Sequence, residues 1–178
     1  MARLFVALSI PTKIITELVK LQPKESGVRW VKPEQIHLTI QFIGEADIAY
    51  TKTLLGSIRA EKFTLNFDKL GCFPTARKPR ILWLGVDICD QLVYLHNTVQ
   101  FKLNQGGICV SGDRFHPHVT LARCNKVCHK SIVTKFLQQT IAAIESFQVN
   151  AFGLYSSQLD SSGSKYQLEH EILLFDRA

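Results

Sequence analysis

The sequence predicts an α+β protein of two similar lobes, related by a pseudo-twofold axis, whose antiparallel sheets flank a central cleft. Strand-like and helix-like apolar periods alternate along the chain, and the order β-α-β-α-β occurs twice. The second strand of each repeat carries the same pattern of His, apolar, Thr, apolar. With 178 residues, 46% of them hydrophobic and 20% charged, the chain has the length and composition of a globular protein. We treat residues 1–178 as one two-lobed domain.

The first half begins with a buried apolar strand and a helix whose first turn contains Pro11. A strand with the first His-x-Thr pattern follows, then a helix with Asp47 as its N-cap and a third strand. These elements are expected at residues 3–10, 11–22, 35–44, 47–60 and 62–73.

The second half repeats the order of strand, helix, strand, helix and strand, and adds one last strand. These elements are expected at residues 80–88, 91–105, 118–123, 130–144, 147–159 and about 165–175. The spacing between equivalent positions grows slowly along the chain, as two copies of one unit with small insertions would produce. Each lobe would therefore contribute one His-x-Thr strand to a shared cleft.

The two patterns place His37 and Thr39 on one strand and His118 and Thr120 on the other. Alternate side chains of a strand share a face, so the four polar groups face one way while their apolar neighbours face the core. Two imidazoles titrating near neutral pH can act as an acid and a base on a phosphodiester, while the hydroxyls donate to its non-bridging oxygens. The near-symmetry of the patterns does not tell the acid from the base.

The formal net charge of +6 favours an anionic partner, with nucleic acid as the leading candidate. No apolar run is long enough to span a membrane, and the start has too short an apolar run for a secretory signal. The five cysteines form an odd set without a secreted framework. These features favour a cytoplasmic protein with reduced thiols.

A metal site has weak support in the sequence. Cys124, Cys128 and His129 form a C-x3-C-H spacing, but a zinc site usually needs a second such cluster, and none is present. The sequence also lacks a G-x-S-x-G nucleophile motif and a phosphate-binding G-x-x-x-x-G-K loop. We therefore expect chemistry without a metal or another cofactor.

Several stretches together resemble a known family. They are "RLFVALSIP", "RWVKPEQIHLTIQFIGE", "CFPTARKPRILWLGV", "FHPHVTLAR" and "LYSSQLDSSGSKYQLEHEILL". The chain resembles the 2H phosphoesterase superfamily, specifically the RNA 2',3'-cyclic phosphodiesterases historically called 2'-5' RNA ligases. The resemblance implies a bilobal α+β fold, metal-independent hydrolysis of a terminal 2',3'-cyclic phosphate to a 2'-phosphate, and weak reversible 2'-5' joining of RNA ends.

The resemblance also implies roles for single residues. It makes His37 the proton donor to the 3' oxygen and His118 the base for water, with Thr39 and Thr120 as phosphate-binding hydroxyls. Arg123 matches an arginine that follows the second motif, and its guanidinium suits two phosphate oxygens. Strict strand alternation, however, puts Arg123 on the face opposite to His118, so its use requires a local change in the strand.

Four further residues are candidates for the cleft. Phe115, Trp30 and Tyr166 are aromatic side chains that could stack on a terminal base, and Gln41 shares the face of the first motif by alternation.

The expected partner is RNA with a 2',3'-cyclic phosphate terminus, with tRNA fragments as one candidate source; no membrane and no second chain is required. A binding module for RNA ends or nucleotides, and a phosphodiesterase for small cyclic nucleotide phosphates, remain alternatives. Dependence on chain length and on salt would separate the last of these from RNA recognition.

Overall fold

The computed structural model describes residues 1–22, 27–112, 114–125, 130–142, 144–160 and 163–176. Its strands are β1 (Ala2–Ser9), β2 (Val28–Trp30), β3 (His37–Ala46), β4 (Phe63–Leu65), β5 (Phe67–Phe73), β6 (Ile81–Val86), β7 (His118–Cys124), β8 (Phe147–Val149), β9 (Ala151–Asp160) and β10 (Gly163–Leu173). Its helices are α1 (Thr12–Lys20), α2 (Ile48–Gly56), α3 (Asp90–Gln105) and α4 (Lys130–Leu137), and a 3-10 turn, η1, spans Pro33–Gln35.

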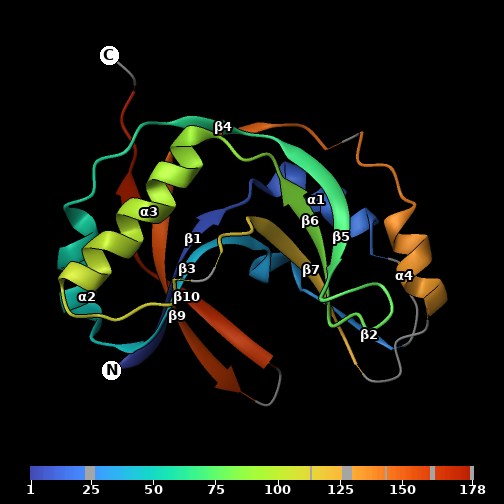
Figure 1. Cartoon of the computed structure of the whole chain (residues 1–178), viewed down its shortest axis with the longest axis horizontal. Helices are drawn as coiled ribbons and strands as arrows, with labels where there is room; N and C mark the ends of the chain where they lie inside the picture. The colour runs from blue at the N-terminus through green and yellow to red at the C-terminus, as the bar shows by residue number, and fades with distance from the viewer. Residues whose placement is uncertain (23–26, 113, 126–129, 143, 161–162, 177–178) are drawn as a thin grey trace.

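The main sheet is antiparallel and runs in the order β10-β9-β1-β3-β7-β6-β5, with β2 paired to the second half of β7, beyond the single Cα pair that joins β7 to β3. β3 and β7, the two His-x-Thr strands, lie at its middle. Figure 1 shows α2 and α3 on the side of β1, β9 and β10, and α4 on the side of β5 and β6. The predicted α+β class with antiparallel sheets around a central site is confirmed.

The two halves of the chain are interlaced rather than folded separately. β5 belongs to the first predicted repeat but pairs with β6 of the second, and β9 of the second repeat pairs with β1 of the first. β1 lies between the motif strand β3 and the exchanged strand β9. In the same way, β6 lies between the motif strand β7 and the exchanged strand β5. The two lobes thus have the same pattern of strand pairing, as a pseudo-twofold axis requires. The exchange follows from the short β5–β6 connection, because strands joined by a short loop usually pair with each other.

Each exchanged strand is broken near its start. The expected strands at 62–73 and 147–159 divide at Asn66 and Asn150, whose carbonyls accept from the N–H groups of Asp87 and Leu174 at 2.9 and 2.8 Å. The short pieces before the breaks, β4 and β8, pair with each other in a separate two-stranded sheet. Because of the breaks, each of the two segments forms one strand of the small sheet and one strand of the main sheet.

The predicted helices form; α1, α2 and α4 are shorter than expected, and α3 begins one residue earlier. Asp47 is the N-cap of α2 as expected, and its carboxylate accepts from the Tyr50 N–H at 2.7 Å. Pro11 lies at the N-cap of α1, one residue before the first helical position. The helix expected at 130–144 ends at Leu137, because the Gln139 N–H bonds to the Phe136 carbonyl three residues back, which tightens the last turn.

One cluster of buried apolar side chains includes residues from both lobes, such as Leu38 of β3 and Val119 of β7. The assignment of residues 1–178 to one domain stays a prediction. None of the helices in the described part of the chain is long and apolar enough to cross a membrane.

The close packing of Trp83 over Gly71 gives a test of the second lobe. A Cβ at position 71 would overlap the Trp83 ring, whereas one at Gly112 would meet no atom within 4 Å. We expect Gly71→Ala to lower the free energy of unfolding by about 1–3 kcal/mol, as overpacking does. The control Gly112→Ala should change it by less than about 0.5 kcal/mol. Urea unfolding of both variants is the measurement, and equal stabilities would contradict the packing described.

Candidate active site

The two His-x-Thr motifs meet where β3 and β7 pair. Leu38 lies opposite Val119 in this antiparallel pair, and both side chains are fully buried. The register around this pair places His37 across from Thr120 and Thr39 across from His118, on the face opposite to the buried pair. Two motifs far apart in the sequence thus form one group of four polar side chains.

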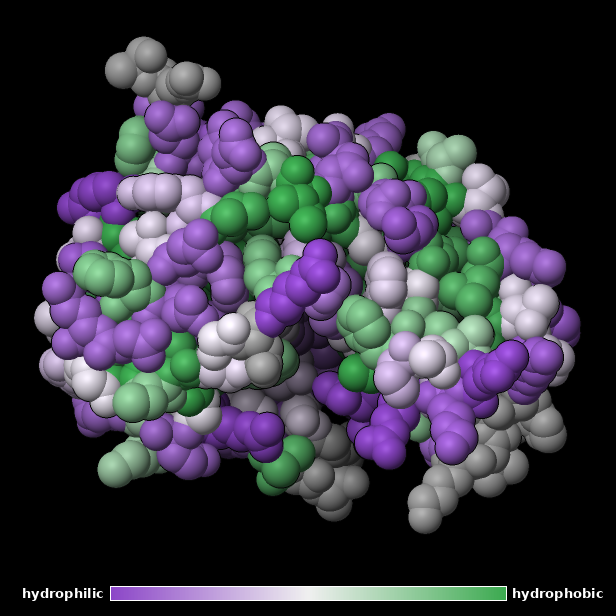
Figure 2. Space-filling view, viewed as in Figure 1, coloured by the Kyte–Doolittle hydropathy of each residue, from purple (hydrophilic) through white to green (hydrophobic). Residues whose placement is uncertain are grey.

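A pocket of about 520 Å³ opens over this group. The space-filling view shows a hollow between the lobes with hydrophilic residues along its rim (Figure 2). Four of the five predicted site residues line the pocket: His37, Thr39, Thr120 and Arg123. His118 is not among the lining residues; its ring lies against that of Phe73, with the two ring centroids 5.2 Å apart.

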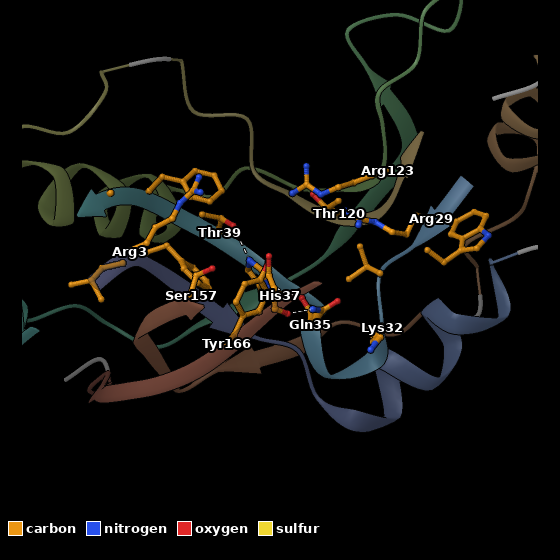
Figure 3. Close-up of a pocket in the computed structure, with 17 residues that line it drawn as sticks. Arg3, Arg29, Lys32, Gln35, His37, Thr39, Thr120, Arg123, Ser157 and Tyr166 are labelled. Carbon is orange, nitrogen blue, oxygen red and sulfur yellow. Dashed lines mark hydrogen bonds between the residues drawn. The ribbon is translucent and has the colours of Figure 1, made fainter. Parts of the chain in front are cut away.

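Backbone carbonyls orient both imidazoles in the same way. Nδ1 of His37 lies 2.7 Å from the carbonyl oxygen of Gln35, and Nδ1 of His118 lies 2.7 Å from that of His116. Each Nδ1–H therefore donates to a carbonyl two residues earlier, which leaves Nε2 as the reactive nitrogen. In His37 this nitrogen is 3.0 Å from the Thr39 hydroxyl, which donates to it when the ring is neutral (Figure 3).

The surroundings of both rings favour the neutral form. Burial lowers the pKa of His37 below its ordinary value of 6.5, the bond to the Gln35 carbonyl opposes this, and positive charge on His118 and Arg123 lowers it further. Burial also lowers the pKa of His118, again opposed by its backbone bond. The rings of Phe5 and Tyr166, centred 5.0 and 5.3 Å from His37, form part of this apolar surrounding.

A β-bulge turns Arg123 toward the pocket. Ala122 pairs with Leu82 and Thr120 with Trp83, so Leu121 is an extra residue in β7. Leu121 and Ala122 are consequently both fully buried, and Arg123 returns to the face of Thr120. Strict alternation would have placed Arg123 on the opposite face; the bulge removes that conflict.

The same bulge occurs in β3 and corrects one expectation. Val6 pairs with Gln41 and Ala7 with Thr39, which makes Ile40 the extra residue. Gln41 is therefore turned into the core, where it is 6% exposed, and it does not share the face of His37. Phe42 takes that face instead, is 66% exposed and lines the pocket. Phe42 and Arg123 occupy equivalent positions, five residues after His37 and His118.

The carbonyl of each extra residue has a partner outside the main ladder. Nδ1 of the buried His96 lies 2.9 Å from the Ile40 oxygen, and the Val31 N–H donates to the Leu121 oxygen at 2.9 Å. Phe115 stacks on His96 with ring centroids 4.0 Å apart, so it supports the first bulge rather than lining the pocket. His96 and Phe115 thus have a structural role.

Trp30 and Tyr166 do line the pocket, as the sequence had indicated. Sequence reasoning missed the polar lining residues Gln35, Ser157, Arg3, Arg29 and Lys32. Gln35 makes two hydrogen bonds: its backbone carbonyl accepts from His37, and its side-chain amide donates to the Ser164 carbonyl. The only available signal was its place two residues before the histidine, the position that His116 occupies before His118.

Among the residues that the structure describes, no group of three or more His, Cys, Asp or Glu side chains could hold a metal ion. Cys128 and His129 of the C-x3-C-H spacing lie outside the described residues.

Known proteins share this sequence and this architecture. The sequence profile of the family described as LigT like phosphoesterase matches residues 8–83. An RNA 2',3'-cyclic phosphodiesterase of Archaeoglobus fulgidus is 33% identical over 174 residues, covering 93% of this chain and 96% of that protein. One of Methanocaldococcus jannaschii is 30% identical over 178 residues, covering 95% and 99%.

This chain belongs to the LigT-like phosphoesterase family. The resemblance noted in the sequence is therefore confirmed. The crystal structure of E. coli LigT complexed with 3'-AMP superposes with a TM-score of 0.80 at 28% identity, covering 97% of this chain and 98% of that one. The family relationship extends over nearly the whole chain, including the interlaced strands of both lobes.

The lowered imidazole pKa values predict a pH dependence. In the free protein, NMR titration of His37 and His118 should give midpoints below 6.5. Because the unfolded chain takes up these protons at a pH near 6.5, both groups contribute stability above that pH that is lost as the pH falls through the folded-state values.

The variant His118→Ala separates the causes. It should raise the His37 midpoint, because one positive neighbour is removed, but leave it below 6.5, because burial is the largest cause. Midpoints at or above 6.5 in the unaltered protein would contradict the environment described here.

Proposed function

We propose that this protein hydrolyses RNA 2',3'-cyclic phosphate ends to 2'-phosphate ends by acid-base catalysis with two histidines. One observation carries the proposal: the pairing of Leu38 with Val119 brings the two His-x-Thr motifs together at a pocket lined by His37, Thr39 and Thr120, and the β7 bulge adds Arg123 to that lining. Two imidazoles, two hydroxyls and a guanidinium complement one phosphate. The relatives described as RNA 2',3'-cyclic phosphodiesterases support the substrate class.

The proton transfers balance over one turnover. Nε2 of neutral His118 takes a proton from water, whose oxygen attacks phosphorus. The bond from phosphorus to the 3' oxygen breaks, and Nε2 of protonated His37 gives its proton to that oxygen. The 2'-phosphate and a 3'-hydroxyl remain, and exchange of protons with solvent restores the two histidines.

The choice of His37 as the acid follows the family assignment, since both rings have the same backbone orientation and lowered pKa values. A bound phosphate would raise both pKa values, because an opposite charge favours the protonated imidazole. With phosphate bound, one histidine could therefore be protonated, although the free protein favours the neutral form of both imidazoles.

The hydroxyls and the guanidinium would act on the phosphate itself. Thr39 and Thr120 donate to the non-bridging oxygens, which become more negative in the transition state. Arg123 provides a charged fork for two oxygens. In this scheme the side chains supply every proton and positive charge, so activity is expected in the presence of EDTA.

The wider setting is also part of the proposal. We take the protein to act as a monomer in the cytoplasm on RNA ends, with tRNA fragments as one source of substrate. A 5'-hydroxyl that attacks the cyclic phosphate in place of water would break the same bond from phosphorus to the 3' oxygen and would leave a 2'-5' linkage; this joining is reversible.

Removing either histidine tests the mechanism. With EDTA present and a short RNA ending in a 2',3'-cyclic phosphate, His37→Ala and His118→Ala should each lower kcat/KM by about 100- to 10,000-fold. The control His170→Ala removes a histidine of β10 that does not line the pocket, and should keep the rate. If the unaltered protein binds this RNA without hydrolysing it, the proposed reaction is wrong and the protein is a phosphate-binding module.

Phe42 provides a test of substrate binding. An exposed aromatic wall beside a phosphate site is suited to stacking of the terminal base. Phe42→Ala should raise KM by about 5- to 150-fold, the range expected for loss of one stacked base, with a smaller change in kcat. Phe101→Ala is a matched control, because Phe101 is 61% exposed on α3, outside the pocket. Equal effects of the two substitutions would exclude stacking on Phe42.

A further inference from the structure

The pocket extends past the two motifs along β2, and this extension is basic. Arg29, Lys32 and Arg123 line it, and the described residues of the pocket lining include no Asp or Glu side chain. In Figure 3, Arg29 and Lys32 lie on one side of His37, while Arg3 and Ser157 lie on the other.

Arg29 and Arg123 are direct cross-strand partners in the β2–β7 pair. Partners in an antiparallel pair have Cα atoms about 5 Å apart and side chains on the same face. Like charges placed directly opposite each other destabilise a sheet. Among the ion pairs of the described residues, none uses Arg29, Lys32 or Arg123, so no carboxylate there offsets the repulsion.

The backbone holds this arrangement in place. The Val31 N–H donates to the carbonyl of Leu121, the extra residue of the β7 bulge, at 2.9 Å. The bulge that turns Arg123 into the pocket therefore also fixes the segment that carries Arg29 and Lys32. Such a basic cluster, open to solvent and joined to a phosphate site, is suited to a second anion.

We propose that Arg29 and Lys32, next to Arg123, form a second phosphate subsite that binds the phosphodiester on the 5' side of the terminal nucleotide. The inference rests on the proposed function, in which the cyclic phosphate occupies the two-histidine centre. In an RNA end, the nearest further anion is the phosphodiester one nucleotide away. The subsite makes the substrate an oligonucleotide end rather than a free cyclic mononucleotide.

The test compares two dinucleotides that end in the same 2',3'-cyclic phosphate. One has a normal phosphodiester linkage, and the other has an uncharged methylphosphonate linkage. The unaltered protein should prefer the charged linkage by roughly tenfold or more in kcat/KM, as expected for hydrogen bonds to a charged group. Arg29→Gln should remove most of this preference and lower hydrolysis of cytidine 2',3'-cyclic phosphate much less than that of the charged dinucleotide, and Lys32→Gln should reduce the preference.

Arg59→Gln is the control for charge, since Arg59 is exposed and outside the pocket. It should keep the preference for the charged linkage. Equal rates on the two dinucleotides would overturn the subsite. So would an Arg29→Gln variant that loses as much activity on the mononucleotide, because Arg29 would then serve the reacting phosphate.

A binding measurement separates this inference from the proposed function. Calorimetry with a dinucleotide ending in a 2'-phosphate does not require turnover. Arg29→Gln should weaken binding and reduce the slope of log K against log salt concentration by about 1. If the protein hydrolyses no cyclic phosphate but shows this change, the subsite stands and the proposed reaction fails. An unchanged slope would overturn the subsite even in an active enzyme.

Discussion

The site depends on one antiparallel contact between two strands that are far apart in the sequence. Leu38 and Val119 form the Cα pair that joins β3 to β7, and each stands between the His and Thr of its motif. Because both side chains are fully buried, the flanking polar residues must face the other way. A slip of one strand by one residue would turn its motif into the core and away from the other motif, so the apolar pair sets the register of the proposed catalytic groups.

The two lobes have the same β-bulge at equivalent positions, but it presents different side chains to the pocket. Each motif strand has a bulge three residues after its histidine, and each bulge returns the residue two positions later to the pocket face. In β3 this residue is Phe42, and in β7 it is Arg123. Pseudo-symmetry of the backbone thus yields an asymmetric pocket, with an aromatic wall on one side and a cluster of positive charge on the other.

Much of the site followed from the sequence because it depends on local alternation. A His and a Thr two positions apart on a strand share a face whatever the rest of the fold does. The bulges could not be predicted in this way, because Ile40-Gln41 and Leu121-Ala122 have no side chains that mark an extra residue. For that reason Gln41 was misplaced and Phe42 was missed. The exchange of β5 and β9 was missed, since periodicity shows that a strand exists but not which strand it pairs with; the short connection between β5 and β6 was a signal for the first of these pairings.

The central claim is that one phosphate contacts both halves of the chain through the two histidines. A crystal structure with a dinucleotide ending in a 2'-phosphate tests it directly. The account predicts a terminal phosphate within hydrogen-bond distance of Nε2 of both His37 and His118. A phosphate bound to one imidazole alone, with the other ring turned away or too distant for proton transfer, would contradict it.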